Sequence, residues 1–384
     1  MKRRPYCCLM SGTRGRLLLV KRRKMDKISI PIGPQHPLLK EPLSMMVDIS
    51  GEKVLGGSLR LGYVHRGIER LAQQRTYVQN IHLIERICGI CSHVHTTTYC
   101  YAVEALLGIE IPPRAQYIRA LMCELERIHS HLLWLGILAK HIGLDTIFMH
   151  TWHDREMVLD IMEEVSGGRI SHAANQIGGV RFDLDEEKGE MIRKILIKLH
   201  SQVEGLLDVI ESEPAAIART KGVAPISPDL IKAYGVVGPI ARASGVDVDM
   251  RRDASLPPYD QLEVKVITHS DGDAWARTFV RVEETRVSLN LCETIIREMP
   301  RGDVVVHAPR RVPEGEVIIR SEAPRGELFY YLRSDGSDKP ARLKVRTPTL
   351  AALSLLPVQL SEINVADIPV VLAGVDLCIA CADR

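Results

Sequence analysis

The clearest chemistry in this sequence lies in two C-x-x-C pairs, one near the start and one at the end: Cys88 with Cys91, and Cys378 with Cys381. A C-x-x-C turn lets two thiolates reach one metal ion. The residues inside the pairs include Gly89 and Ala380, which are small enough for a close approach. Four sulfurs could therefore hold a structural zinc ion, the commonest use of paired motifs of this kind.

The separation of the pairs and the residues around them argue against a simple zinc site. Zinc motifs usually close over about one or two dozen residues, whereas these pairs stand at opposite ends of the chain. Ionisable residues flank both pairs: Glu85, Arg86, His93 and His95 around the first, and Asp376, Asp383 and Arg384 around the second. Because soft thiolates also select nickel, copper(I) and iron, spacing alone leaves open zinc, a redox-active metal, a redox dithiol and unrelated thiols.

Length and composition predict a globular protein. The chain has 384 residues, 46% hydrophobic and 26% charged, enough for a large core in one or two domains. The net charge of +2 is close to neutral, so nucleic acid has little support as a partner. Nine cysteines at irregular spacing, without a secretory signal, indicate a reducing compartment. No run of about 18 apolar residues occurs, so we expect no membrane crossing by this chain.

Residues 1–25 form a basic extension that is neither a secretory signal nor a membrane span, because Gly12, Arg14 and Arg16 break its apolar runs. We expect a disordered tail or a mis-assigned start, since Met25 begins a stretch that reads like a natural start. Cys7 and Cys8 fall in this extension and carry little weight. Residues 26–384 are expected to form a single domain.

Hydrophobic periodicity indicates the elements that must position the cysteines. Residues 28–61 alternate and predict a β-hairpin that turns at Gly56-Gly57. A helical period runs through residues 67–165, with breaks at Pro112-Pro113 and Gly143. Each C-x-x-C pair must therefore lie next to helical structure or at its end.

The second half of the chain repeats this change of period. Helical patterns cover residues 186–211 and 273–298, separated by a Pro- and Gly-rich connection at 225–260. Residues 302–374 contain alternating strands around an Asp335-Gly336 turn, followed by an apolar stretch. The expected fold class is α+β: a predominantly helical bundle core with small β-sheet regions near the N-terminus and in the C-terminal third.

Taken together, the motifs resemble the large, catalytic subunit of nickel-iron hydrogenases. The resemblance begins with R-I-C-G-I-C and D-x-C-x-x-C-x-x-R and extends to four further segments: PIGPQHPLLKEP, GYVHRGIE, GGRISHAANQIGGVRFD and SEAPRGEL. The GPQHP and HRG-x-E elements are shared with the 49-kDa-type subunit of respiratory complex I. The resemblance thus points to the energy-converting, membrane-associated hydrogenase group and implies one catalytic domain over residues 26–384.

The resemblance implies a Ni-Fe centre whose iron also carries carbon monoxide and cyanide. By position, Cys88 and Cys378 would be terminal ligands of nickel, and Cys91 and Cys381 would bridge nickel to iron. The implied reaction is reversible heterolytic cleavage of dihydrogen, in which Cys378 or Arg325 could be the base that accepts the proton. Since arginine rarely gives up its proton, electrostatic positioning is the plainer role for Arg325.

Two carboxylates complete the implied site. Glu41 corresponds to the proton-gate glutamate of the family, against the plainer interpretation of a solvated carboxylate before a proline. Asp376 corresponds to the aspartate ahead of the third cysteine, where it would hold Arg325 or the cofactor pocket through charge-assisted bonds. His36 and His65 belong to the family motifs and are candidates for proton transfer or a subunit interface.

The other histidines and cysteines are expected to be structural. A lone histidine among apolar residues is more often a core or surface residue than a ligand, which applies to His93, His95, His129 and His131. The isolated Cys100, Cys123 and Cys292 are expected to be buried thiols.

Partners follow from the same resemblance. With four cysteines used, the chain retains no run able to bind an iron-sulfur cluster, so another subunit must carry the electrons. The family supplies a small subunit with a [4Fe-4S] cluster, ferredoxin-like relay subunits and membrane subunits that move ions. Ferredoxin is the expected redox partner, and the chain is expected to lie peripherally on the cytoplasmic side of the cell membrane.

Two departures from the family pattern leave an alternative open. Leu377 stands where the family commonly has proline, which loosens the turn but removes no ligand. Because no residue follows Arg384, we expect that no C-terminal peptide has to be cleaved. The alternative is a complex I-like scaffold or assembly subunit with a structural four-cysteine zinc site and no hydrogenase activity.

Overall fold

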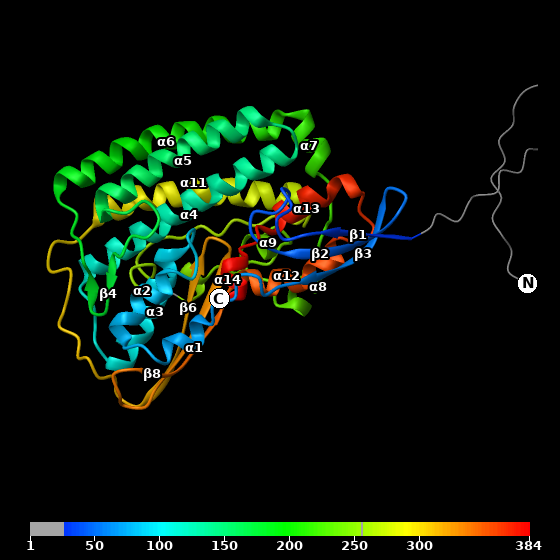
Figure 1. Cartoon of the computed structure of the whole chain (residues 1–384). Coiled ribbons are helices and arrows are strands. Elements are labelled where there is room, and N and C mark those ends of the chain that lie inside the picture. Colours follow the sequence, from blue (N-terminus) through cyan, green and yellow to red (C-terminus); the bar gives the residue numbers. More distant parts are fainter. Residues whose placement is uncertain (1–26, 255) are drawn as a thin grey trace, which may run out of the picture.

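The computed structural model describes residues 27–254 and 256–384, so the expectations for residues 1–25, including Cys7 and Cys8, lie outside the described residues. A bundle of long helices forms one side of the molecule (Figure 1). Its members are α4 (Pro113–His141), α5 (Asp145–Ser166), α6 (Glu186–Ser212) and α11 (Ala274–Glu298). Pro112-Pro113 stands at the start of α4 and Gly143 separates α4 from α5, as predicted, and the helical core is confirmed.

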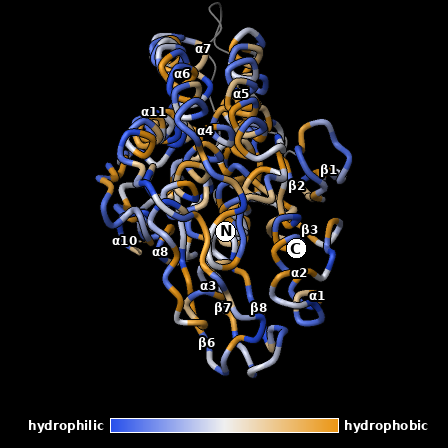
Figure 2. Tube along the Cα trace, turned by 90° about the vertical axis from the view of Figure 1, so that its left-hand side faces the viewer, coloured by the Kyte–Doolittle hydropathy of each residue, from blue (hydrophilic) through white to orange (hydrophobic). Residues whose placement is uncertain are grey.

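The bundle forms because each helix has an apolar face. In α6, buried residues recur every three or four positions: Ile192, Leu196, Leu199 and Val203. Figure 2 shows hydrophobic and hydrophilic residues along both α5 and α6, as this amphipathic pattern requires. At the start of α11, the Asp273 side chain accepts a hydrogen bond from the Ala276 amide (2.7 Å), which caps the helix.

The N-terminal sheet differs from prediction in the position of its turn. Its antiparallel strands are β1 (Ile28–Ile32), β2 (Ser44–Ser50) and β3 (Lys53–Arg60). The predicted hairpin is present, but its turn lies at Gly51-Glu52, and Gly56-Gly57 lies inside β3. The placement at Gly56-Gly57 was therefore wrong. The register shifts beside Gly56, which has a φ of 156°, so these glycines mark a β-bulge and not a turn.

The C-terminal sheet carries the other predicted strands: β6 (Gly315–Ala323), β7 (Gly326–Ser334) and β8 (Pro340–Arg346). They pair antiparallel in the order β6-β7-β8. Asp335-Gly336 lies in the β7–β8 connection, as predicted. A second tight turn, Pro324-Arg325, joins β6 to β7, because Ala323 pairs directly with Gly326.

Shorter helices link these parts. Three connect the N-terminal sheet to the bundle: α1 (Ile68–Ala72), α2 (Tyr77–Glu85) and α3 (Ser92–Leu107). The connection between α6 and α11 contains four short helices: α7 (Pro214–Thr220), α8 (Pro228–Tyr234), α9 (Pro239–Arg242) and α10 (Met250–Asp253). The small ladder itself, β4 (Asn175–Gln176) with β5 (Gly179–Val180), precedes α6. After β8 come α12 (Pro348–Gln359), α13 (Ile368–Val375) and α14 (Ile379–Asp383), with a 3-10 turn at Val365–Asp367.

This arrangement confirms the α+β fold class and shows what surrounds the cysteines. Helix α3 packs against α2 and α4 and against the strands β6 and β7, while α13 packs against α4 and α11. The N-terminal and C-terminal C-x-x-C pairs therefore lie on segments that the bundle and the C-terminal sheet hold from both sides. Within residues 27–254 and 256–384, no helix has both the length and the apolar character that a membrane crossing requires.

Candidate metal centre

The first cysteine pair lies in the turn between α2 and α3. Helix α2 ends at Glu85, and Cys91 is the residue directly ahead of α3. The Ile90 amide donates a hydrogen bond to the Cys88 sulfur (3.2 Å), which is the tight loop expected of a C-x-x-C turn. Both sulfurs therefore face inward from one short backbone segment.

The second pair lies at the start of α14. Cys378 precedes this helix and Cys381 lies within it. Two threonines at the start of α12 hold this segment: the Cys378 amide donates to Thr349 Oγ1 (3.3 Å), and the Thr347 hydroxyl donates to the Cys381 carbonyl (3.2 Å). Asp376, just before the pair, has a φ of 51°, a left-handed conformation that aspartate tolerates better than most residues.

The fold brings all four predicted cysteines together. The sulfur of Cys88 lies 3.4 Å from that of Cys378, and the sulfur of Cys91 lies 3.5 Å from that of Cys381. All four side chains are buried. Hydrogen bonds from the Cys378, Cys381 and Cys91 thiols lower the pKa of Cys88 well below its ordinary value, so the group already favours one thiolate. Two sulfur pairs at this separation can share a metal site.

Arg325 and Asp376 form a buried ion pair beside the sulfurs. The Arg325 Nε donates to the Asp376 carbonyl (3.0 Å), and its Nη2 donates to Asp376 Oδ1 (3.1 Å). Lys40 Nζ reaches the same carboxylate oxygen at 3.4 Å. Burial opposes ionisation of Asp376, but the charges of Arg325, Lys40 and Arg281 together hold its pKa below the ordinary value. Asp376 is therefore an ionised anchor for two cations.

Glu41 contacts the backbone of the second pair. Its Oε2 accepts a hydrogen bond from the Ala380 amide (2.6 Å), between the two cysteines. Burial raises the pKa of Glu41, although the bond from the Ala380 amide works in the other direction. A cavity of about 30 Å³ borders Glu41, Lys40 and His141, which is room for ordered water. The position suits a carboxyl group that exchanges a proton.

Comparison with known proteins agrees with this geometry. The family model for the 49-kDa subunit of respiratory-chain NADH dehydrogenase matches residues 141–312 and 304–384, and the nickel-dependent hydrogenase model matches residues 66–149. The chain is 39% identical to the carbon monoxide-induced hydrogenase of Rhodospirillum rubrum, covering 94% of this chain and 100% of that protein. It belongs to the nickel-iron hydrogenase and complex I 49-kDa subunit family.

Other members of this hydrogenase/49-kDa family match over nearly the same length. The membrane-bound hydrogenase subunit alpha of Pyrococcus furiosus is 39% identical, covering 93% of this chain and 87% of that protein. A solved structure of the membrane-bound sulfane sulfur reductase, an archaeal respiratory membrane complex, superposes with a TM-score of 0.90 at 30% identity. That match covers 94% of this chain and 99% of the other. The predicted resemblance is confirmed at the level of the family.

The residues present fit the metal centre that the family implies. Four buried sulfurs supply the soft donors that nickel and iron accept. Buried polar atoms normally have hydrogen-bond partners, yet Arg325 Nη1 and Asp376 Oδ2 have none among the described residues. The residues present are therefore compatible with a metal centre.

The family motif GYVHRGIE has a structural role that the sequence did not predict. Asp383 Oδ2 accepts hydrogen bonds from the Gly62 amide (2.7 Å) and the Val64 amide (3.3 Å), and the His65 ring contacts the Asp383 carbonyl. The neighbouring Arg66 donates to the Ala380 carbonyl (3.2 Å). This loop therefore clasps the segment that carries Cys378 and Cys381.

His36 shares no such contact with the cysteine-bearing segments. Its ring is exposed, and Nδ1 accepts a hydrogen bond from the Leu38 amide two residues later (3.2 Å). The proposed proton or interface roles of His36 and His65 therefore stay predictions, although His65 has the structural contact just described.

One residue at the site, Glu126, was missed as a functional candidate, and another, His95, was expected to be only structural. Glu126 in α4 accepts hydrogen bonds from the His93 amide (2.6 Å) and the Val94 amide (3.0 Å), so it caps the start of α3 directly after Cys91. The His95 Nε2 lies 3.6 Å from the Cys381 sulfur, and its Nδ1 lies 2.7 Å from the Tyr330 hydroxyl. A carboxylate within the apolar run LMCELERI was the available signal for Glu126, since a charge there needs a buried partner.

The remaining structural expectations can be compared directly. The isolated Cys100, Cys123 and Cys292 are buried, as predicted, and burial raises the pKa of Cys100 to about 12. Burial also keeps a group of histidines neutral by lowering their pKa values to about 3 or 4: His93, His95, His129 and His131. All four lie in the core, and of the four only His95 contacts a candidate ligand sulfur, so a purely structural role for His95 stays a prediction.

Proposed function

We propose that this chain is the catalytic large subunit of an energy-converting [NiFe] hydrogenase that oxidises H2 and reduces protons reversibly. The observation that carries the proposal is the convergence of two buried C-x-x-C pairs, with sulfur separations of 3.4 and 3.5 Å, beside the unpaired Arg325 Nη1. Cys88, Cys91, Cys378 and Cys381 are the proposed metal ligands. The matches to two hydrogenases at 39% identity support the same activity.

When bound, a nickel-iron centre supplies the Lewis acidity for heterolytic cleavage of H2. The chain's own residues position the reacting groups and accept the proton that is released. Burial works against the charge of Arg325, but the Asp376 carboxylate and then the nearby sulfurs of Cys378, Cys88 and Cys91 hold its pKa above the ordinary range. It therefore stays a cation that positions negative or polar groups at the centre, and Asp376 fixes its orientation.

Glu41 is the proposed proton carrier. It interacts with the Cys378 thiol on one side and borders a small cavity, lined mostly by apolar side chains, on the other. Because burial raises its pKa, it can take up and release a proton nearer neutral pH than an exposed carboxyl group can. A proton leaving Cys378 then has Glu41 as a defined acceptor.

The electrons have to leave through another protein. Among the described residues, the only groups of three or more potential metal ligands are those formed by the four cysteines and His95. We propose a small subunit with a [4Fe-4S] cluster, ferredoxin-like relay subunits and ferredoxin as the electron route, together with membrane subunits that move ions. The chain would lie peripherally on the cytoplasmic side of the cell membrane, in keeping with the membrane-bound complexes among its relatives.

Elemental analysis and infrared spectroscopy of the native complex test this proposal. We expect nickel and iron, with absorption bands in the region of metal-bound carbonyl and cyanide. The competing function is a complex I-like scaffold with structural zinc, which a purely four-sulfur site also suits. One zinc per chain with no nickel and no such bands would overturn the hydrogenase proposal.

A further inference from the structure

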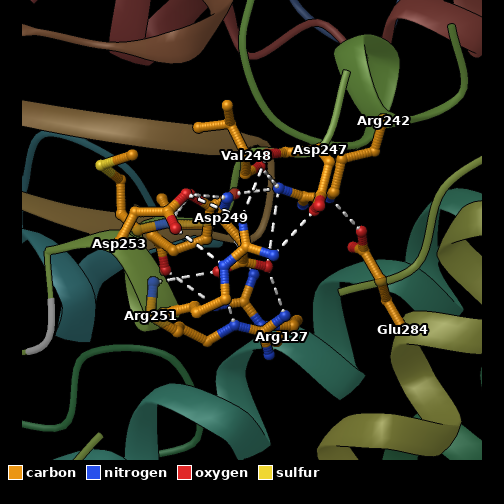
Figure 3. A network of polar contacts seen from close by, with 12 residues as sticks. Arg127, Arg242, Asp247, Val248, Asp249, Arg251, Asp253 and Glu284 are labelled. Atoms are coloured by element: carbon orange, nitrogen blue, oxygen red, sulfur yellow. Dashed lines mark hydrogen bonds and ion pairs between the residues drawn. The ribbon is translucent and has the colours of Figure 1, made fainter. Parts of the chain in front are cut away.

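A cluster of buried charged side chains lies between the bundle and the β6–β7 hairpin whose turn carries Arg325. It joins residues of α4, α9, α10, α11 and β6, each at most 5% exposed: Glu124, Arg127, Arg242, Asp249, Arg251, Glu284 and Glu322. We call these residues the buried ion cluster. Figure 3 shows Arg242 and Arg251 converging on Asp249, with Arg127 and Glu284 alongside. Within the described part of the chain, none of its side chains hydrogen-bonds to a cysteine sulfur, so the ligand set does not explain the cluster.

Arg127 holds the backbone of the hairpin directly ahead of its turn. Its Nη2 donates to the Glu322 carbonyl (2.8 Å), and its Nη1 donates to the Ala323 carbonyl (3.1 Å). Ala323 is the last residue of β6, and Arg325 follows two positions later in the turn. A single guanidinium from α4 thus fixes the two peptides from which the turn departs.

Both carboxylate oxygens of Glu322 also accept hydrogen bonds. Its Oε1 accepts from Arg242 Nη1 (2.9 Å), and its Oε2 accepts from the Met250 amide (3.0 Å). Arg242 is in turn fixed by Glu284 Oε1 (2.6 Å). The residue before Ala323 is therefore anchored through both its backbone and its carboxylate.

The turn packs closely against the loop ahead of α9. A Cβ atom on Gly238 would lie 2.4 Å from the Arg325 carbonyl, and one on Gly326 would lie 2.7 Å from the Gly238 Cα. Because Gly238 directly precedes α9, which carries Arg242, the cluster and the turn share one support. A shift of the cluster must move the turn.

We propose that the buried ion cluster positions Arg325 against the sulfurs, with Arg127 and Glu322 as the positioning residues that carry most of this role. The inference rests on the proposed function, because positioning matters only if the guanidinium faces a reactive centre. The physical argument is that buried ions are costly, and well-packed apolar residues often stabilise a core equally well. Directional bonds to both carbonyls and to both carboxylate oxygens fix a geometry that apolar packing would not.

The decisive variant is Arg127→Met in the intact complex. It removes both carbonyl contacts but leaves Glu124 bonded to Arg251 (3.0 Å), Ser288 (2.6 Å) and Tyr259 (2.6 Å), so no carboxylate is orphaned. We expect unchanged nickel and iron content, a shift of the carbonyl and cyanide infrared bands, and about a 100-fold loss of turnover, the size of effect that about 1 Å of misplacement produces. Arg127→Lys should recover part of the turnover and reverse part of the band shift.

Arg119→Met is the matched control. Arg119 is also buried, pairs with Glu104 through two bonds (2.8 and 2.7 Å) and donates to two carbonyls, those of Gln176 and Gly179, but does not contact the hairpin. It should lose stability without moving the infrared bands. If Arg127→Met fails to assemble, Glu322→Gln provides the same measurement, because it keeps the shape and one acceptor oxygen.

Hydrogen-deuterium exchange of the β6–β7 turn gives a readout that does not depend on turnover. Amides near Arg325 should exchange faster in Arg127→Met than in the parent and in Arg119→Met. Unmoved infrared bands with unchanged exchange would overturn the positioning role. A native complex with zinc and no such bands would instead overturn the proposed function, and the exchange measurement would still report whether the cluster fixes the turn.

Discussion

Arg66 donates a hydrogen bond to the carbonyl of Ala380, the residue directly ahead of Cys381 (3.2 Å). The same guanidinium donates to the Ile87 carbonyl (2.9 Å), directly ahead of Cys88, and to the Arg86 carbonyl (2.6 Å). One side chain from the HRG-x-E motif therefore links the backbones of both cysteine pairs, which come from opposite ends of the chain.

Replacing Arg66 by methionine should weaken metal binding. The change breaks the contacts to the peptides ahead of Cys88 and Cys381, and losses of this kind around a metal site typically cost about 10- to 100-fold in affinity. Metal content after dialysis against a chelator measures the effect. Arg70→Met is the control, because Arg70 is exposed and, within the described residues, its side chain hydrogen-bonds to Gln73 alone (3.1 Å). Equal metal retention in both variants would contradict the role of Arg66.

Glu41→Gln should suppress turnover while leaving the metal content intact. The amide keeps an oxygen for the Ala380 hydrogen bond but cannot carry a proton, and loss of a proton-transfer group typically costs about 10²- to 10⁴-fold. Hydrogen oxidation assays with elemental analysis of the same samples measure this. The exposed Glu52→Gln serves as the control. Undiminished activity in Glu41→Gln would remove Glu41 from the proton path.

Asp376→Asn should destabilise the protein by about 3–5 kcal/mol, the typical cost of leaving a buried charge without its partner. The change keeps the size of the side chain but leaves Arg325 and Lys40 without their shared anion. Thermal or denaturant unfolding of the purified chain gives the measurement. Asp335→Asn, in an exposed turn, should change stability little. A stability equal to that of the parent would show that the ion pair contributes nothing.

Stability should fall as the pH is lowered from about 6.5 toward 4. The pKa values of His131 and His95 are lowered by burial to about 4, and those of His93 and His129 to about 3, whereas an unfolded histidine titrates at 6.5. In that window each of these histidines binds more protons in the unfolded chain than in the folded one. Each therefore lowers the free energy of unfolding by up to about 1.4 kcal/mol for every pH unit of acidification.

Unfolding midpoints between pH 7 and pH 4.5 measure this acid sensitivity. His131→Gln should flatten the slope, because it removes one of the groups that protonate on unfolding, while the exposed His36→Gln should not. A midpoint independent of pH across this range would be inconsistent with neutral buried histidines.

Much of the secondary structure followed from local patterns. The long helices were predictable because their apolar periodicity and their proline and aspartate boundaries are local properties, as in α4 and α11. The Gly56-Gly57 turn was mispredicted because a glycine pair indicates either a turn or a bulge. Which of the two it is depends on the pairing of Asp48 with Gly56 across the sheet, which no local pattern contains.

The candidate site divides in the same way. The sequence by itself indicated the candidate ligands, because two C-x-x-C pairs supply four soft donors, and the motifs around them identified the family. Only the tertiary structure decided that Arg66 links the two pairs, that Glu126 caps α3 behind Cys91, and that the buried ion cluster supports the turn of Arg325. Such contacts join residues far apart in the chain, and a charged side chain in a helix does not reveal its partner until the fold has excluded water around both.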